Sequence, residues 1–355
     1  MYAGSIPTLA STFQRPRVIP VVLKFKPWVV ASAGCGLAVY LASPPVGAGA
    51  DHHLHLFSPV LADLLESRAR GTDPELAALL DPVAFKTRSV EEVLSLLDES
   101  GLERGVLLSG AYMFSSPLLE DLDLDVPGLV RQENTHNVQA AASSGGRLVA
   151  FVGINPLEQG SLEELAFWVS HGGIAGIKLH LANSGFNFAD PEHVRRLSAV
   201  FSAAADADLA VVVHLRSGPV YGAEEAQAFV DRVLPAAADI PVQLAHGGGW
   251  GGLDQGTLDA LEVYVAAMER GAAGSRQLVI DLAMLTLGEE TPLALREHAA
   301  ALIRRAGLVR FVMGSDWPAV FRPQAHEAYL RQQLPLSDQE WDVIVGNKAP
   351  YLLTP

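Results

Sequence analysis

Cysteine is almost absent from this 355-residue sequence, since Cys35 is the only one. The chain beyond residue 50 therefore has neither disulfide bonds nor thiolate metal ligands. Charged residues are also scarce at 18%, and positive charge is the scarcer kind, with 25 Lys and Arg against 40 Asp and Glu. A net charge of −15 argues against a basic binding surface. We therefore expect no nucleic-acid partner.

Two other patterns are missing. No Gly-x-Gly-x-x-Gly follows the first expected strand, which argues against a dinucleotide-binding doubly wound sheet. The apolar stretch at 27–42 is shorter than a membrane-spanning helix usually is, so we expect no stable membrane insertion after N-terminal processing. Because 49% of the residues are hydrophobic, a substantial core is expected and general disorder is not.

The first 50 residues differ in composition from the rest. They contain four Lys or Arg residues and no Asp or Glu, and the apolar stretch at 27–42 is followed by small residues that end in Ala-Gly-Ala at 48–50. This order is typical of an export signal. We predict that residues 1–50 are a signal-like or anchoring segment and that the mature protein is periplasmic or extracellular. One alternative is that this segment is an uncleaved membrane anchor. The other is that the natural protein starts near the barrel, without this segment, and is cytoplasmic.

Beyond residue 50, short apolar runs alternate with helix-like segments. Most runs are rich in β-branched residues and lack alternation, as is typical of parallel strands buried on both faces. Eight runs are present, namely the stretch near Asp51 and the runs at 105–109, 148–154, 174–180, 209–214, 242–246, 278–282 and 309–316. Such alternation over about 300 residues predicts an α/β fold, a single TIM (β/α)8 barrel spanning residues 51–355, with a doubly wound sheet as the alternative.

Several helix starts are marked by capping signals. The Ser-x-x-Glu pattern of a capping box occurs at 89–92, 161–164 and 337–340. A capping residue precedes a proline at Asp190-Pro191 and at Thr291-Pro292. Two connections, 58–88 and 110–130, are long enough to be lids over the mouth of a barrel, although decorated surface is the alternative.

The most informative short motif is His53-Leu54-His55. Side chains two residues apart share one face of a strand, so these imidazoles can converge on one metal ion. Alone, the pair is also compatible with two polar residues on a strand face. Further polar residues end later strand-like runs, namely His180, His214, His246 and Asp316. A barrel gathers the C-terminal ends of its strands around one mouth, so we predict a shared metal site there.

With these motifs the chain resembles the amidohydrolase superfamily, in the branch that contains aminocarboxymuconate-semialdehyde decarboxylase and related hydrolases. The resemblance runs from Asp51 to the C-terminus. Its marks are Asp-x-His-x-His-x-Phe at 51–57, Arg-Leu-Val-Ala-Phe-Val-Gly-Ile-Asn-Pro at 147–156, Gly-Ile-Lys-Leu-His at 176–180, His214, Ala245-His246, Gly314-Ser-Asp316 and Gly346-Asn347. It implies one divalent metal ion, expected to be zinc, whose ligands are His53, His55, His214 and Asp316. It also implies that His246 lies over the metal-bound water or the substrate.

The resemblance further places Lys178 and His180 near the substrate. Some superfamily members carboxylate such a lysine to bridge two metals, whereas we expect one metal here. The planar guanidinium group of Arg216 can donate two parallel hydrogen bonds to a substrate carboxylate. The alternative is that Arg216 forms an ion pair at the barrel rim. His52 is expected to be structural and to face the helix layer. The remaining histidines are expected to be solvated or capping residues, namely His136, His171, His193, His298 and His326.

We therefore predict a metal-dependent hydrolase that uses metal-activated water on a small organic acid, lactone or amide. Its catalytic residues are His246 and Asp316. Non-oxidative decarboxylation by the same ligands is the enzymatic alternative, and an inactive barrel that binds a metal or ligand is the alternative from another class. The expected partner is a small-molecule substrate, one bearing a carboxylate if Arg216 binds it. Homo-oligomerisation is left open.

Overall fold

The structure is a computed structural model that describes residues 49–71, 85–218, 220–287, 291–319 and 322–353. Most of the predicted export segment, residues 1–48, lies outside the described residues. Strand β1 (Gly49–Leu54) begins at Gly49, so the last two residues of the predicted segment belong to this strand, and cleavage after Ala50 would remove them from it. No helix in the described ranges is both long and apolar enough to cross a membrane.

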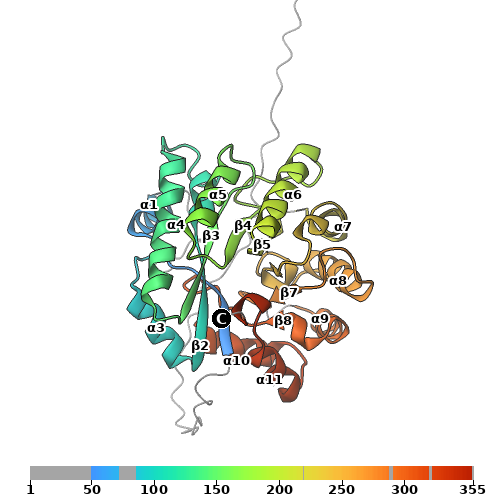
Figure 1. Ribbon diagram of the computed structural model, residues 1–355. Coiled ribbons are helices and arrows are strands. Elements are labelled where there is room, and N and C mark those ends of the chain that lie inside the picture. The colour runs from blue at the N-terminus through green and yellow to red at the C-terminus, as the bar shows by residue number, and fades with distance from the viewer. Residues whose placement is uncertain (1–48, 72–84, 219, 288–290, 320–321, 354–355) are drawn as a thin grey trace, which may run out of the picture.

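The described residues form an eight-stranded parallel sheet in which each strand pairs with the next along the chain (Figure 1). The strands after β1 are β2 (Leu102–Leu108), β3 (Leu148–Gly153), β4 (Gly176–His180), β5 (Ala210–His214), β6 (Val242–Leu244), β7 (Leu278–Asp281) and β8 (Phe311–Val312). Two backbone hydrogen bonds join β1 to the chain after β8, from the His52 nitrogen to the Met313 carbonyl at 3.0 Å and from the Asp316 nitrogen to the His53 carbonyl at 2.9 Å. The predicted TIM barrel is confirmed.

Helices connect the strands and surround the sheet (Figure 1). The α-helices are α1 (Pro59–Gly71), α3 (Val90–Glu99), α4 (Val126–Ser143), α5 (Ser161–His171), α6 (Pro191–Asp206), α7 (Ala223–Arg232), α8 (Gln255–Glu269), α9 (Leu293–Ala306), α10 (Pro323–Gln333) and α11 (Asp338–Gly346). Short 3-10 helices are η1 (Ala111–Ser115), η2 (Leu234–Ala237), η3 (His246–Gly248), η4 (Leu308–Arg310) and η5 (Pro350–Leu352). The long connections expected at 58–88 and 110–130 thus contain α1, η1 and the start of α4.

The capping predictions are confirmed at three helices. Ser89 with Glu92 and Ser337 with Glu340 form complete capping boxes, and Asp190 caps α6. The other two predictions are wrong by one residue. Gly160 precedes α5 and Ser161 is already helical. Likewise Pro292, not Thr291, is the cap of α9.

The barrel encloses a packed core rather than a pore. Its interior is filled by Ala50, Val106, Leu108, Phe151, Ala210, Val212, Val279 and Val312, with Tyr351 and Leu352 of η5 in the same cluster. A larger apolar cluster combines residues of β3 to β8 with residues of the surrounding helices. Each fully buried Leu or Phe contributes about 1.5–3 kcal/mol to folding. This core can therefore support polar and strained residues at the mouth.

Three predicted site residues lie beyond the strands that were expected to carry them, and the first is His55, which directly follows the end of β1 at Leu54. Strand β6 ends at Leu244, so His246 begins η3 with φ 57°. Strand β8 ends at Val312, so Asp316 lies on the following loop with φ 59°. Positive φ is unfavourable for residues other than glycine, and such conformations cluster at functional sites. His180 and His214 end β4 and β5, as predicted.

The prediction that His52 faces the helix layer is wrong. The pairing of β1 with β2 shifts between Asp51 and Leu54, and this irregularity breaks the strict alternation of faces. The His52 ring lies edge-on to Tyr351, with 6.4 Å between centroids. Its Nδ1 donates to the Met313 carbonyl at 2.8 Å, and its Nε2 accepts from the Ala349 nitrogen at 3.1 Å. Both ring nitrogens thus connect β1 to the C-terminal part of the chain.

Candidate active site

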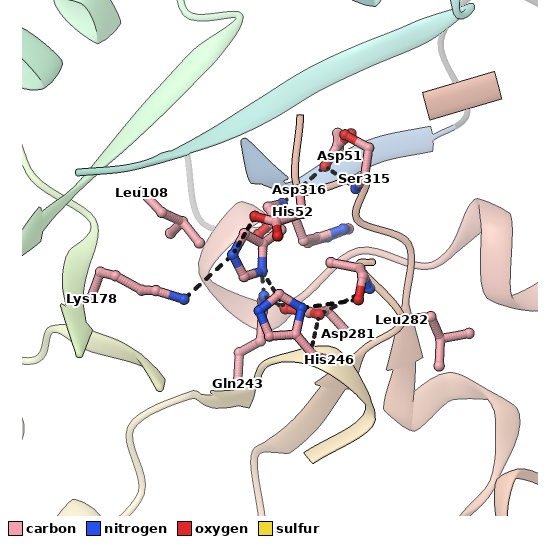
Figure 2. A network of polar contacts seen from close by, with 12 residues as sticks. Asp51, His52, Leu108, Lys178, Gln243, His246, Asp281, Leu282, Ser315 and Asp316 are labelled. Atoms are coloured by element: carbon pink, nitrogen blue, oxygen red, sulfur yellow. Dashed lines mark hydrogen bonds and ion pairs between the residues drawn. The ribbon is translucent and has the colours of Figure 1, made fainter. Parts of the chain in front are cut away.

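The predicted site residues come from strands all around the barrel and gather at the C-terminal ends of those strands. His53 lies in β1 and His55 follows directly after its last residue, and we call this pair the β1 imidazoles. Lys178 and His180 belong to β4, and His214 belongs to β5. His246 and Asp316 follow β6 and β8. Figure 2 shows Lys178, His246 and Asp316 converging from different elements.

The Asp316 carboxylate meets both imidazoles of β1. Its Oδ1 lies 3.1 Å from His55 Nε2 and 3.4 Å from His53 Nε2. Burial would raise the pKa of Asp316, but positive charge on His53, His246 or His55, whenever one of these rings is protonated, outweighs burial and lowers this pKa well below its usual range. Burial lowers the pKa of His53 to about 3, and the charge of Lys178 lowers it further. Asp316 is therefore ionised and His53 neutral near pH 7.

The second nitrogen of each β1 imidazole is already engaged. His53 Nδ1 donates to Asp281 Oδ2 at 3.0 Å, and His55 Nδ1 donates to the Leu108 carbonyl at 2.7 Å. Because a carboxylate and a carbonyl only accept, each ring carries its proton on Nδ1. Two Nε2 lone pairs and a carboxylate oxygen therefore face one another. A cation among them relieves this repulsion, so these residues fit a divalent metal ion.

The His246 imidazole has the same arrangement. Its Nδ1 donates to the Ala283 carbonyl at 3.0 Å, which leaves a lone pair on Nε2. Its ring lies 4.7 Å from the His53 ring and 5.0 Å from the His214 ring, centroid to centroid. The turn that carries it needs glycine at Gly248, where φ is 79° and a Cβ atom would lie 2.8 Å from the Tyr264 ring.

The β4 and β5 side of the mouth is a stack of rings. His180 and His214 are nearly parallel, with 3.9 Å between centroids, and the Tyr112 ring lies 4.9 Å from His180. His180 Nδ1 accepts from the Asn183 nitrogen at 3.3 Å, so its proton is on Nε2. Burial keeps the pKa of both histidines well below the usual range.

His214 is the predicted ligand that the structure brings least close to the others. Ligand atoms of His53, His55 and Asp316 all lie within 4.8 Å of one another, and among the described residues no such group includes His214. Its Nδ1 is buried and has no hydrogen-bond partner in the described part of the chain. A buried nitrogen without a partner is costly unless an ion, water or ligand contacts it.

Lys178 is the buried cation of the site. Its Nζ lies 3.4 Å from His53 Nε2. Burial lowers the pKa of Lys178 to about 8, although attraction to Asp281 and Asp316 opposes this effect. Its amine is mostly in the ammonium form near pH 7.

Arg216 lies at the rim. Its Nη1 donates to Asp254 Oδ2 at 2.9 Å, and its guanidinium carbon lies 5.8 Å from the centroid of the Trp250 ring. This is the rim ion pair considered above as the alternative to carboxylate binding. A substrate carboxylate would have to share Arg216 with Asp254 or displace it.

Sequence reasoning missed three polar residues of the site. Asp281 ends β7 and is fully buried, and Gln243 of β6 donates to it at 2.6 Å. A lone aspartate at the end of a barrel strand is a signal that could have identified Asp281. Tyr112 lies in η1, within a long connection that carries no motif. The expectation for His326 is wrong, because this residue is buried and its Nε2 donates to the Leu282 carbonyl at 2.8 Å.

Comparison with known proteins identifies the family. The family model described as Amidohydrolase matches residues 122–347, well over half of the chain. The chain belongs to the amidohydrolase family. No curated protein matches the sequence.

Solved structures share the amidohydrolase barrel at low sequence identity. One is 5-carboxyvanillate decarboxylase from Sphingomonas paucimobilis, 16% identical with a TM-score of 0.55, where the match covers 84% of this chain and 96% of that one. Another is a probable 2-pyrone-4,6-dicarboxylic acid hydrolase from Acinetobacter baumannii with citric acid bound, 17% identical with a TM-score of 0.50 and the same coverage. A third is dihydroxybenzoic acid decarboxylase from Polaromonas sp. JS666 with bound manganese and 2-nitroresorcinol, 15% identical with a TM-score of 0.52, covering 84% and 94%.

Proposed function

We propose that this amidohydrolase is a metal-dependent hydrolase of a small organic acid, lactone or amide. The observation that supports it most is the meeting of two Nε2 lone pairs with the Asp316 carboxylate. We assign one divalent ion to His53, His55 and Asp316, with His214 completing the set. Such an ion, when bound, polarises a substrate oxygen and makes water more acidic. Zinc is our expectation, although His and Asp donors also accept manganese, the ion bound in one solved structure of this fold.

Asp316 and His246 are the proposed proton acceptors. Asp316 is ionised, and its carboxylate lies beside the proposed metal site, so it can take a proton from an attacking water. His246 donates through Nδ1 to the Ala283 carbonyl, so its Nε2 can accept a hydrogen bond or a proton from the same water. A proton held at either position can then pass to the leaving group, as general acid–base catalysis requires.

The proposed substrate contacts are hydrogen-bond donors on the opposite side of the mouth. His180 carries its proton on Nε2, and Lys178 supplies an ammonium group. Tyr112 supplies a hydroxyl on a ring that lies 4.9 Å from the His180 ring. Donors of this kind suit the anionic oxygen of a carboxylate or the oxyanion that develops during hydrolysis. Arg216 is a further candidate at the rim if a substrate carboxylate displaces Asp254.

Non-oxidative decarboxylation is the second candidate, because two of the three solved structures described above are decarboxylases. In that reaction the bond between the substrate carboxylate and its carbon atom breaks, and carbon dioxide leaves. The carbon atom that carried the carboxylate then takes up a proton. We place the hydrolase first because the Asp316 carboxylate lies beside the proposed metal site, where it can take a proton from water.

The test begins with elemental analysis of the purified full chain, followed by a screen of metal-reconstituted protein against lactones, amides and aromatic carboxylates. The reaction found is then run in ¹⁸O-labelled water while carbon dioxide is assayed. We expect label in the product. Release of carbon dioxide without incorporation of oxygen would make the protein a decarboxylase. A fully metallated protein without turnover of any substrate would favour the inactive barrel.

We also propose that the protein is exported, on the composition of residues 1–50. N-terminal sequencing of the mature protein from its native host tests this proposal. A mature protein that begins at Met1 and stays in the cytoplasm would refute it.

A further inference from the structure

We propose that Asp281 is a positioning residue whose single carboxylate orients two histidines at once, His53 and His246. The inference rests on the proposed function, in which these imidazoles are a metal ligand and a proton acceptor. Asp281 is the last residue of β7 and is fully buried. Figure 2 shows it next to His246 and Gln243.

The Asp281 carboxylate accepts hydrogen bonds on both oxygens. Oδ2 accepts from His53 Nδ1 at 3.0 Å and from Gln243 Nε2 at 2.6 Å. Oδ1 accepts from the backbone nitrogens of His246 at 2.8 Å and of Ala283 at 3.1 Å. The direction of the Gln243 bond is certain, because the same Nε2 also donates to the His52 carbonyl at 3.1 Å.

These bonds determine where two imidazole protons reside. On Oδ2, the carboxylate keeps a proton on His53 Nδ1 and directs the Nε2 lone pair toward Asp316. On Oδ1, it holds the η3 turn in which His246 has φ 57°. The same oxygen holds Ala283, whose carbonyl accepts from His246 Nδ1 at 3.0 Å.

Only a carboxylate suits this position, because all four partners are donors. In Asp281→Asn, the amide NH₂ must face two of them whichever way it is turned. If the NH₂ faces His53, the ring has to accept at Nδ1, and its proton moves to Nε2, where the metal-binding lone pair is lost. If the NH₂ faces the backbone, the nitrogens of His246 and Ala283 lose their acceptor.

The competing explanation is that Asp281 only stabilises the fold, as any satisfied buried carboxylate would. Glu133 of α4 provides the matched control. It is equally buried and accepts from the Ser58 nitrogen at 3.0 Å and from Asn137 Nδ2 at 3.2 Å. No hydrogen bond in the described part of the chain joins it to a site histidine. Glu133→Gln therefore measures what loss of a buried carboxylate costs without disturbing His53 or His246.

The experiment uses the metal-free full chain with ¹⁵N-labelled histidine, in which NMR reports the tautomer of each imidazole. In the wild type we expect His53 and His246 as neutral Nδ1–H tautomers. In Asp281→Asn, at least one of them should change to Nε2–H or lose its single tautomer. Affinity for Zn²⁺, measured by competition with a chelator, should fall about 10–100-fold, as is typical when a partner behind a metal ligand is lost. Glu133→Gln should keep both tautomers and the affinity.

Three results would overturn the proposal. The first needs no variant and is a wild-type His53 with its proton on Nε2, which remains decisive if Asp281→Asn fails to fold. The second is Asp281→Asn with both tautomers unchanged and a Zn²⁺ affinity within twofold of the wild type. The third is Glu133→Gln with the same losses as Asp281→Asn, which would make the effect a general consequence of destabilisation. None of these measurements involves turnover, so failure of the hydrolase proposal would leave them interpretable.

Discussion

The two sides of the barrel mouth differ in how their polar groups are satisfied. On the side built from β1, β6, β7 and β8, every site imidazole has an acceptor for its Nδ1 proton. His53 has Asp281, His55 has the Leu108 carbonyl, and His246 has the Ala283 carbonyl. The orientation of these rings is therefore set before any metal or substrate arrives.

On the side built from β4 and β5, a buried ring nitrogen remains without a partner in the described part of the chain. This atom is His214 Nδ1, which has no hydrogen bond there. The rings there are held by stacking, with His180 between Tyr112 and His214. We infer that the first side is preorganised for the metal and for proton transfer, and that the second side is completed by what binds.

The largest effect should follow from Asp316→Asn. This change removes the charge that meets both β1 imidazoles, together with the proposed proton acceptor. We expect loss of metal and a fall in kcat of about 10²–10⁴-fold, the usual size of general acid–base assistance. Metal analysis and steady-state kinetics on the identified substrate measure both. Asp254→Asn at the rim is the matched control and should retain the metal. An Asp316→Asn variant that keeps its metal and most of its activity would contradict the assignment of metal binding and proton transfer to the side built from β1, β6, β7 and β8.

His246→Asn should have the next largest effect. The change removes the Nε2 lone pair while leaving His53, His55 and Asp316 in place. We expect full metal content, a fall in kcat of about a hundredfold or more, and a smaller change in KM. Normal turnover by this variant would show that His246 is a structural histidine and takes no part in proton transfer.

Tyr112→Phe tests the second side directly. It removes one hydroxyl and keeps the ring that contacts His180. Loss of a single hydrogen bond to the substrate costs about 0.5–1.5 kcal/mol, so KM should rise by up to about tenfold while kcat and metal content stay close to wild type. The control is Tyr221→Phe, because the Tyr221 hydroxyl contacts Tyr264 in the core at 2.5 Å. An unchanged KM in Tyr112→Phe, or an equal rise in Tyr221→Phe, would contradict the assignment.

Arg216→Met should have the smallest effect. Arg216 is paired with Asp254 at the rim, and such partly exposed pairs contribute about 0–1 kcal/mol. We expect KM to change about fivefold or less, and the denaturant midpoint of unfolding to change little. A much larger rise in KM, confined to substrates that carry a carboxylate, would show that Arg216 binds the substrate and that Asp254 only holds it in the absence of ligand.

Much of the fold and part of the site could be predicted from sequence. The barrel follows from unalternating β-branched runs separated by helix signals, and His53, His55 and His214 follow from strand periodicity and strand ends. Orientation that depends on a local irregularity could not be predicted. His52 faces inward because the β1 register shifts by a residue, and a shift of this size reverses the faces of a strand.

The second limit concerns contacts between neighbouring strands. Asp281 reaches His246 and Gln243 because β6 pairs with β7, and it reaches His53 of β1 past the short strand β8. Nothing in the apolar run at 278–282 specifies these partners. Similarly, His246 and Asp316 lie past their strands in conformations with positive φ, which the apolar runs before them do not indicate.

Metal stoichiometry tests the central claim most directly, namely that the imidazoles of β1 and Asp316 hold one ion. The full chain and the double variant His53→Ala/His55→Ala would be incubated with excess Zn²⁺, desalted and analysed for metal, with circular dichroism to check folding. We predict one ion per wild-type chain and none in a folded double variant. A double variant that keeps its full complement would contradict the ligand assignment. Two ions per wild-type chain, with one lost in Lys178→Ala, would instead establish a lysine-bridged pair of metals.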